Sequence, residues 1–160
     1  MEIHRLTLDT NILREFWDKR SKYKLIKKLL ALADEGKVDL AVTARIRDDI
    51  PRIPLSERIN NLPLLNITET GAVFRLDVSQ LDRDFLGDDV FVEWEKSLNK
   101  TGGKEYPDWR DWDHIHAHYL LKRDFFLTWD KHILGFTKEL NKQFGIVVMK
   151  PEDYFANLLR

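Results

Sequence analysis

The sequence predicts an α/β protein, a three-layer sandwich in which helices cover both faces of a mainly parallel central sheet. Strand-like and helix-like segments alternate at both ends of the 160-residue chain, which is the pattern that produces such a sheet. In addition, the strand-like run at residues 1–8 stops just before Asp9, and the strand-like run at residues 125–128 stops shortly before Asp130. Since the carboxyl ends of parallel strands share one edge, we expect these two carboxylates to meet there.

Apolar spacing and capping residues place the individual elements. Residues 1–8 form the first strand, and Thr10 is expected to cap a short helix that ends at Trp17. Ser21 is expected to cap a longer helix, whose apolar residues recur at helical spacing until Gly36. The remaining elements are strands over residues 38–43, 125–128 and 146–149, and helices over residues 44–50, 109–122, 133–144 and from Pro151 onward.

The middle of the chain, residues 51–106, has a less clear order of elements. Two strand-like runs, residues 65–68 and 72–78, flank Thr70 and Gly71 and predict a hairpin. A helix is expected to begin near residue 88, and its apolar face consists of Val90, Phe91, Trp94 and Leu98. The length of the chain predicts a single domain, residues 1–160, in which this middle segment is atypical or inserted.

Composition excludes several classes of site. The chain has no cysteine, so disulfides, thiolate metal sites and a cysteine nucleophile are excluded. Its 26 basic residues nearly balance its 27 acidic ones, so any contact with nucleic acid must come from a local patch. No apolar run approaches the roughly 18 to 20 residues that span a membrane, and the N-terminus lacks the layout of a signal peptide. We therefore expect a cytoplasmic protein without membrane contact.

Four lysines accompany the helix that is expected to end at Gly36. They lie mostly off its apolar stripe and are Lys22, Lys24, Lys27 and Lys28. This pattern favours a solvated helix face over a groove for nucleic acid.

Four carboxylates are candidates for one acidic cluster. Asp9 and Asp130 follow strands, Asp111 lies in the first turn of the helix that leads into the strand at 125–128, and Asp49 lies on the helix after the second strand. If the strands are neighbours, these side chains converge, and their like charges would raise one another's pKa unless a cation neutralised them. Oxygen ligands without thiolates suit Mg²⁺ or Mn²⁺.

Each carboxylate also has an ordinary structural explanation. An Asp after a strand, such as Asp9, often caps a helix or starts a turn. Asp111 lies three residues after Asp108, an arrangement close to a capping box, and Asp49 could simply be solvated. No single position therefore establishes a metal site.

Four short motifs decide between these interpretations. They are Leu8-Asp9-Thr10-Asn11-Ile12-Leu13, Asp111-Trp112-Asp113-His114-Ile115-His116-Ala117, Leu127-Thr128-Trp129-Asp130-Lys131, and Gly145-Ile146-Val147-Val148-Met149-Lys150-Pro151-Glu152-Asp153-Tyr154. In this order, and with a 19-residue step from Asp111 to Asp130, they resemble the motifs of the PIN domain family of nucleases. The resemblance covers both ends of the chain and implies a PIN-like fold.

The resemblance implies a PIN-type metal-dependent endoribonuclease that cleaves single-stranded or structured RNA. The residues expected to bind one or two Mg²⁺ or Mn²⁺ ions, and so to carry the catalysis, are Asp9, Asp49, Asp111 and Asp130. Supporting residues are expected within the same motifs, namely Asn11, Asp113, His114, Thr128 and Lys131. An antitoxin-like protein, as in a toxin–antitoxin pair, and a second copy of the chain are further candidate partners, although no interface signal stands out in the sequence.

Two departures from the family pattern affect these expectations. The family usually has Glu as its middle acidic residue, whereas this chain offers Asp48 or Asp49, and the aliphatic residue after Asp49 favours the latter. Residues 51–106 match no specific part of the pattern, so substrate choice could reside there.

Other interpretations stay open. One is a catalytically weak or inactive PIN-like module that binds RNA or a protein, and another is a magnesium-dependent phosphatase, although the chain lacks a second Asp two residues after Asp9. His114 and His118 lie one helical turn apart and could hold zinc, but the resemblance explains His114 without it. Tryptophans near the acidic residues could stack on unpaired bases, although core packing is favoured for Trp112. Cations expected to offset phosphate charge are Arg45, Arg47, Arg110 and Lys131.

Overall fold

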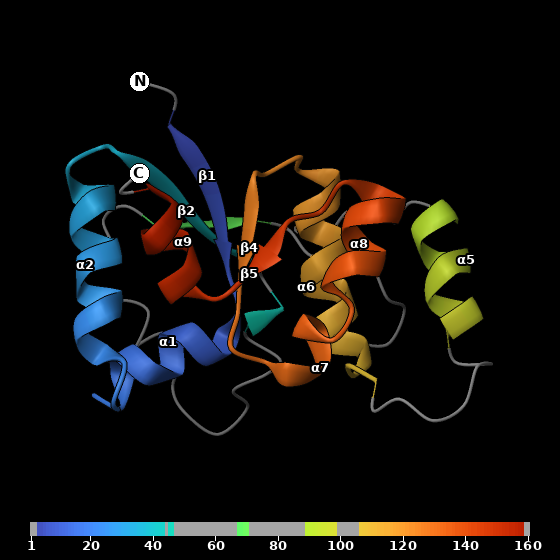
Figure 1. Cartoon of the computed structure of the whole chain (residues 1–160), viewed down its shortest axis with the longest axis horizontal. Coiled ribbons are helices and arrows are strands. Elements are labelled where there is room, and N and C mark those ends of the chain that lie inside the picture. Colours follow the sequence, from blue (N-terminus) through green and yellow to red (C-terminus); the bar gives the residue numbers. More distant parts are fainter. Residues whose placement is uncertain (1–2, 44, 47–66, 71–88, 99–105, 159–160) are drawn as a thin grey trace.

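A parallel sheet forms the middle layer of the structure, a computed structural model that describes residues 3–43, 45–46, 67–70, 89–98 and 106–158. Within these residues the sheet has five strands in the order β3-β2-β1-β4-β5, and every neighbouring pair is parallel (Figure 1). The strands are β1 (His4–Leu8), β2 (Val38–Thr43), β3 (Ile67–Thr70), β4 (Phe125–Leu127) and β5 (Val148–Met149). The chain turns in opposite directions from β1, toward β2 on one side and β4 on the other, which makes the β1–β4 boundary a topological switch point.

Helices form the two outer layers. One face of the sheet is covered by α1 (Thr10–Trp17), α2 (Tyr23–Asp34) and α9 (Pro151–Leu158), as Figure 1 shows. On the other side lie α5 (Asp89–Leu98), α6 (Trp109–Leu120), α7 (Lys131–Leu134) and α8 (Thr137–Phe144). Two separate apolar cores fill the spaces between the layers, and the α/β three-layer sandwich predicted from the sequence is confirmed. None of the helices in the described ranges is long and apolar enough to cross a membrane.

The alternation of side chains along β1 explains why both faces are covered. Leu6 and Leu8 are buried in the core beneath α1 and α2. Thr7, between them, faces the opposite layer, where its hydroxyl hydrogen-bonds Nδ1 of His118 on α6 at 2.8 Å. A buried polar residue of the strand is thus satisfied by the helix that packs on it.

The start of α1 differs from the prediction by one residue. Asp9, and not Thr10, is the N-cap, because its side chain accepts a hydrogen bond from the backbone N–H of Thr10. Similarly, α2 begins after Lys22, which makes no side-chain capping bond, so the prediction of a Ser21 cap was wrong. The end of α2 is as expected, because Gly36 has φ of 67°, in the left-handed region that glycine adopts without strain.

The segment after β4 forms two helices instead of the single helix predicted over residues 133–144. The backbone N–H of Gly135 bonds the carbonyls of Lys131 and His132, which closes α7 after one turn. The chain then bends so that Phe136 packs into the core, and α8 continues to Gly145. A periodic apolar pattern cannot reveal this bend, because the buried residues on both sides of it keep their spacing.

Two predictions for the middle of the chain were wrong where the structure describes it. Thr70 belongs to β3, which pairs in parallel with β2, so it is not in the turn of a hairpin, and the run at 72–78 lies outside the described residues. Val90 is 58% exposed, whereas its neighbour Phe91 is fully buried and stacks on His116 at 4.2 Å between ring centroids. Val90 therefore lies beyond the edge of the apolar face of α5.

The burial of His118 predicts a loss of stability in acid. Burial, with contributions from Arg123 and Arg5, lowers the pKa of His118 from 6.5 to about 3. The unfolded chain therefore takes up a proton before the folded chain does, so the stability present above about pH 6.5 is lost as the pH falls toward 3.

Replacing this histidine should remove that pH dependence. Between about pH 7 and about pH 5, we expect the original chain to lose about 2 kcal/mol more unfolding free energy than the His118→Asn variant. Urea unfolding curves at both pH values measure the difference. An equal loss in the two proteins would contradict a neutral buried imidazole.

Candidate metal centre

The candidate site is an open cavity at the carboxyl edge of the sheet, next to the β1–β4 switch point. Its volume is about 180 Å³. The residues that line it are Asp9, Thr10, Asn11, Arg14, Asp108, Arg110, Asp111 and Asp130. Three of the four carboxylates expected in the acidic cluster therefore face one space, although Asp111 and Asp130 are separated from Asp9 by about a hundred residues of sequence.

Asp9 is buried at the end of β1 and held by several donors. The backbone N–H of Thr10 donates to Oδ1 at 2.6 Å. The Asn11 amide and the Thr128 hydroxyl donate to Oδ2 at 2.6 and 2.5 Å. Because hydrogen bonds to a carboxylate favour its charged form, these contacts hold a fixed negative group against the cavity.

The same donors tie Asp9 to the loop after β4. Besides bonding Asp9, Thr128 accepts hydrogen bonds from the Asn11 amide at 3.0 Å and from the backbone N–H of Asp130 at 2.8 Å. The Asn11 side chain also accepts from the backbone N–H of Trp129 at 3.3 Å. Asn11 and Thr128 therefore fix the position of Asp130 relative to Asp9.

Asp130 is the N-cap of α7. Its Oδ1 accepts from the backbone N–H groups of His132 at 2.6 Å and Ile133 at 3.3 Å. Oδ2 takes no part in these bonds. Asp130 thus has both of the roles considered for an Asp after a strand: it caps a helix, and it faces the cavity that Asp9 and Asp111 also line.

Asp111 combines a structural and an electrostatic role in the same way. Its Oδ2 accepts from the backbone N–H of Asp108 at 3.0 Å, which completes the predicted capping box of α6. Burial is the largest cause that raises the pKa of Asp111, and the charges of Asp9, Asp108 and Asp130 add to it, so that together they bring the pKa to about 7 although the hydrogen bond from the backbone of Asp108 lowers it. The cavity therefore concentrates negative charge.

Two of the predicted supporting residues lie behind the cavity, not in it. Asp113 is buried and pairs with Arg45, whose Nε lies 3.0 Å from Oδ2 of Asp113. His114 is buried too, and it contacts the hydroxyls of Thr43, at the end of β2, and Thr10, at the start of α1. Both residues join α6, and hence Asp111, to the end of the sheet.

Other predicted residues do not line the cavity. The guanidinium of Arg45 is directed at buried Asp113, so the expectation that it offsets phosphate charge was wrong. Lys131 is exposed on α7, outside the cavity. Trp112 is in the core, as favoured, and Trp129 donates its indole N–H to Glu152 at 2.7 Å. Arg47, Asp48 and Asp49 lie outside the described residues.

Sequence reasoning missed Arg14 as a cavity residue. It lies one turn beyond Thr10 and Asn11 on α1, so its spacing from the first motif was the available signal. Arg110, named among the candidate cations, does line the cavity, and its Cζ lies 5.3 Å from the ring centroid of Trp109. Two guanidinium groups therefore face the same space as the carboxylates.

The donor chemistry of the cavity suits a hard divalent cation. Its candidate ligands are carboxylate oxygens, and burial together with the neighbouring negative charges raises the pKa of Asp111, an effect that a cation would offset. In the arrangement described, however, no three His, Asp or Glu side chains of the described ranges lie close enough together to hold one ion. The oxygen ligands are of the type that Mg²⁺ or Mn²⁺ prefers, but the carboxylates would have to move closer together to bind one ion.

Comparison with known proteins identifies the fold. No family model and no curated protein matches the chain. Among solved structures, it is similar to a chain in the crystal structure of VapBC2 from Rickettsia felis bound to a DNA fragment from their promoter. The TM-score is 0.56 at 12% sequence identity, and the match covers 91% of this chain and 98% of that chain. VapBC2 is a PIN-domain complex. The chain has a PIN-like fold. At this identity the similarity supports the PIN-like fold alone.

The raised pKa of Asp111 predicts how the metal-free PIN-like domain responds to pH. Because the folded pKa, about 7, lies above the ordinary value of 3.8, the stability present below about pH 3.8 is lost as the pH rises to 7. Asp111→Asn keeps an oxygen for the capping box but cannot ionise. Without metal at about pH 8, we expect the variant to be on the order of 1 to 3 kcal/mol more stable than the original chain.

Unfolding curves at about pH 8 and about pH 4 test this expectation. The advantage of the variant should disappear at the lower pH, where both side chains are neutral. A variant that is less stable than the original chain at both values would show that capping, and not charge repulsion, dominates at this position.

Proposed function

We propose that this chain is a metal-dependent nuclease that hydrolyses RNA. The observation that carries the proposal is the placement of Asp9, Asp111 and Asp130 around one open cavity at the switch point, where burial and the charges of Asp9 and Asp130 raise the pKa of Asp111. Carboxylates gathered at the place where α/β folds bind ligands favour a cation-dependent reaction. The PIN-like fold supports a hydrolase of the nuclease class.

The three carboxylates would hold Mg²⁺ or Mn²⁺ in different ways. Asp9 is fixed by its hydrogen bonds, whereas Asp111 Oδ1 and Asp130 Oδ2 are outside their capping bonds and can turn toward an ion. Asp49 is proposed as a fourth ligand. A bound divalent cation would polarise the phosphodiester and supply hydroxide at neutral pH.

Arg14 and Arg110 are proposed to hold the phosphate. Guanidinium groups bind phosphate oxygens in a bidentate manner, and both residues line the cavity with the acidic side chains. Arg110 is steadied by Trp109 and by Asp108, whose Oδ2 lies 3.7 Å from its Nη1. Cations at this position would offset the repulsion between a nucleic acid and the carboxylates.

The named neighbour suggests partners. VapBC2 is a toxin–antitoxin complex, so we propose an antitoxin-like protein as a partner of this chain, together with assembly as a homodimer in the cytoplasm. Residues 51–106 are proposed as the part of the single domain that selects the substrate. Co-purification with the product of an adjacent reading frame would test the protein partner.

A second candidate is an inactive PIN-like module that binds RNA or a protein. It is favoured by the distances in the described site, where no three potential ligands are close enough to share an ion. Calorimetric titration with Mn²⁺ separates the two candidates. Saturable binding that Asp9→Asn abolishes supports the nuclease, and binding that Asp9→Asn leaves unchanged, or no binding, supports the inactive module.

Cleavage of RNA should depend on the acidic cavity. We expect Asp9→Asn and Asp130→Asn each to reduce Mn²⁺-dependent cleavage of labelled RNA by about 100-fold or more, because each removes a metal-binding charge. Asp153→Asn, which changes an exposed carboxylate on α9, is the matched control and should leave cleavage unchanged. Thermal melting checks that the variants fold. Full activity in a folded Asp9→Asn protein would refute the assignment.

The cavity arginines should affect substrate binding more than the chemical step. Arg14→Gln removes a proposed phosphate contact, so we expect KM to rise by about tenfold while kcat changes less. Lys142→Gln, on the exposed surface of α8, serves as the control. Unchanged KM in the Arg14 variant would exclude this residue from phosphate binding.

A further inference from the structure

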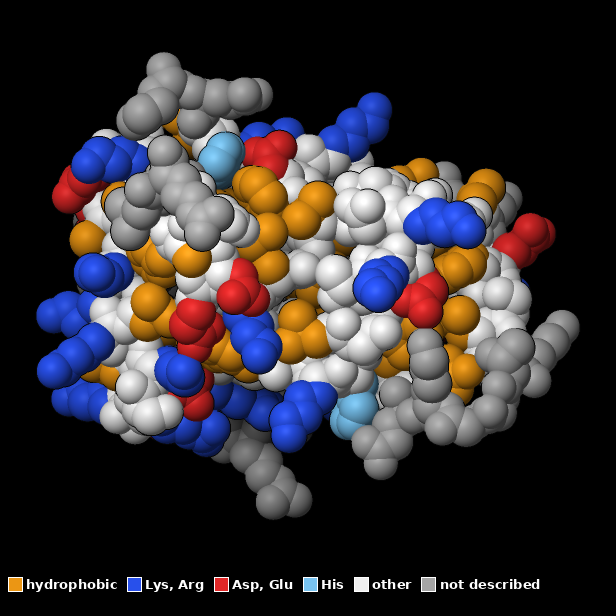
Figure 2. All heavy atoms as spheres, in the orientation of Figure 1, with side chains coloured by type: hydrophobic (Ala, Val, Ile, Leu, Met, Phe, Trp, Pro, Cys, Tyr) orange, Lys and Arg blue, Asp and Glu red, His pale blue; other side chains and the backbone are white. Residues whose placement is uncertain are grey.

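Basic residues are concentrated in one short part of a nearly neutral chain. Residues 14–28 contain seven basic and two acidic residues, whereas the whole chain has 26 and 27. Figure 2 shows blue side chains gathered at the lower left, over α1 and α2. We call this set the basic band, and it consists of Arg14, Lys19, Arg20, Lys22, Lys24, Lys27 and Lys28.

Ion pairs neutralise only part of the basic band. Arg20 pairs with Asp18 at 2.7 Å, and Lys22 pairs with Glu152 of α9 at 2.6 Å. Lys24 and Lys28 lie one helical turn apart on the exposed face of α2, and no ion pair of the described residues involves them. Their positive charge is therefore open to a ligand.

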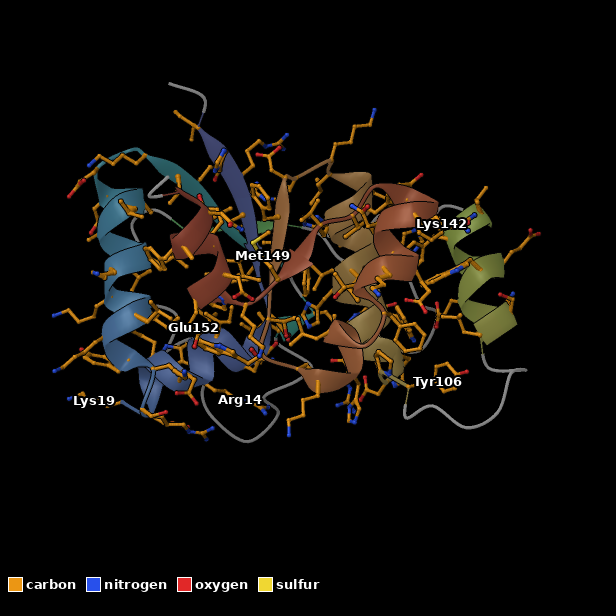
Figure 3. All side chains as sticks on the ribbon, viewed as in Figure 1. Arg14, Lys19, Tyr106, Lys142, Met149 and Glu152 are labelled. Atoms are coloured by element: carbon orange, nitrogen blue, oxygen red, sulfur yellow. The ribbon has the colours of Figure 1, made fainter. Side chains whose placement is uncertain are left out.

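One end of the basic band reaches the acidic cavity. Arg14, which lines the cavity, is on α1, and α1 leads directly to Lys19 and Arg20. Figure 3 labels Arg14 and Lys19 along the same lower edge of the molecule, the edge at which β1 ends. A chain of phosphates held in the cavity can thus continue over the basic band without crossing the molecule.

Aromatic rings lie among these cations. Phe16 and Tyr23 are half-buried and stacked, with ring centroids 5.2 Å apart and an interplanar angle of 21°. Nζ of Lys27 lies 6.0 Å from the centroid of the Tyr23 ring. Proteins that bind unpaired nucleotides combine cations, which contact the phosphates, with aromatic rings, on which the bases stack. In a duplex the faces of the bases are not accessible to such rings.

We propose that the basic band binds the backbone of a single-stranded polynucleotide whose cleavable phosphate lies in the acidic cavity. The inference rests on the proposed nuclease function and adds to it a strand path and a requirement for unpaired substrate. The lysine pattern alone favoured a solvated helix face. The continuity with Arg14 and the stacked aromatic pair are the two observations that change this interpretation.

Binding measured without metal tests the surface apart from catalysis. The probe is fluorescently labelled oligouridylate in EDTA, and its anisotropy is followed over a series of KCl concentrations. The double variant Lys24→Gln/Lys28→Gln removes two proposed phosphate contacts. The matched control is Lys138→Gln/Lys142→Gln, which changes two exposed lysines with the same spacing on α8.

The proposal makes a quantitative prediction. The α2 double variant should weaken binding by about tenfold at moderate salt and reduce the slope of log K against log salt by about 1.4, because each lost contact with a single strand contributes about 0.7. The α8 double variant should leave both quantities unchanged. Equal effects of the two variants, or no effect of the α2 variant, would overturn the proposal.

Competition identifies the class of ligand. Unlabelled oligouridylate should displace the probe, whereas duplex RNA and polyglutamate should compete more weakly at equal charge. Equally strong competition by duplex RNA would overturn the assignment to single strands, and equally strong competition by polyglutamate would overturn the assignment to nucleic acid. A DNA oligonucleotide of the same sequence shows whether the sugar is also read.

A separate cleavage assay distinguishes failure of this proposal from failure of the nuclease assignment. If oligouridylate binding depends on Lys24 and Lys28 but no added divalent metal ion leads to cleavage of the RNA, the proposal for the basic band is supported and the nuclease function is not. If RNA is cleaved with Mn²⁺ and the α2 variant cleaves long and short oligonucleotides as the original chain does, the nuclease function stands and the basic band is excluded.

Discussion

The arrangement of the site depends on the buried carboxylate of Asp9. It accepts hydrogen bonds from Thr10, Asn11 and Thr128, so it caps α1 and at the same time joins the end of β1 to the end of β4. Thr128 in turn holds the backbone of Asp130. An apolar residue at position 9 would leave several buried donors without an acceptor, which is costly in a folded protein. Burial raises the pKa of Asp111 across the cavity, and the charge of Asp9 adds to that effect.

Sequence reasoning predicted the layers, the parallel sheet and the convergence of Asp9, Asp111 and Asp130, because hydrophobic periodicity and the residues at strand ends and helix starts are local signals. It failed where contacts between residues far apart in the sequence, or the packing of the core, decided the role of a residue or the end of a helix. Arg45 has the charge of a phosphate ligand but is held by buried Asp113, and no local pattern reveals that pair. The break between α7 and α8 likewise follows from how Phe136 packs in the core. Arg14 was missed because its role follows from the helix that Asp9 begins.

Charge is distributed unevenly over a protein that is nearly neutral overall. Negative groups meet in a cavity at the switch point, and positive groups gather along α1 and α2 beside it. Such a separation suits an anionic polymer. The basic surface would attract the polymer, and Arg14 would place it beside the acidic cluster, which would need a bound cation to tolerate the negative charge of the polymer. The PIN-like fold supplies the scaffold for this arrangement, and the proposed chemistry would be carried by side chains placed upon it.

Asp9, Asp111 and Asp130 are proposed to bind a divalent cation together. Crystals grown with Mn²⁺ and measured for anomalous scattering test this proposal most directly. We predict one or more anomalous peaks in the acidic cavity, about 2.1 Å from carboxylate oxygens of these residues, with the side chains of Asp111 and Asp130 turned toward the ion. A cavity without an anomalous peak at saturating Mn²⁺, or a peak bound elsewhere on the protein, would contradict it.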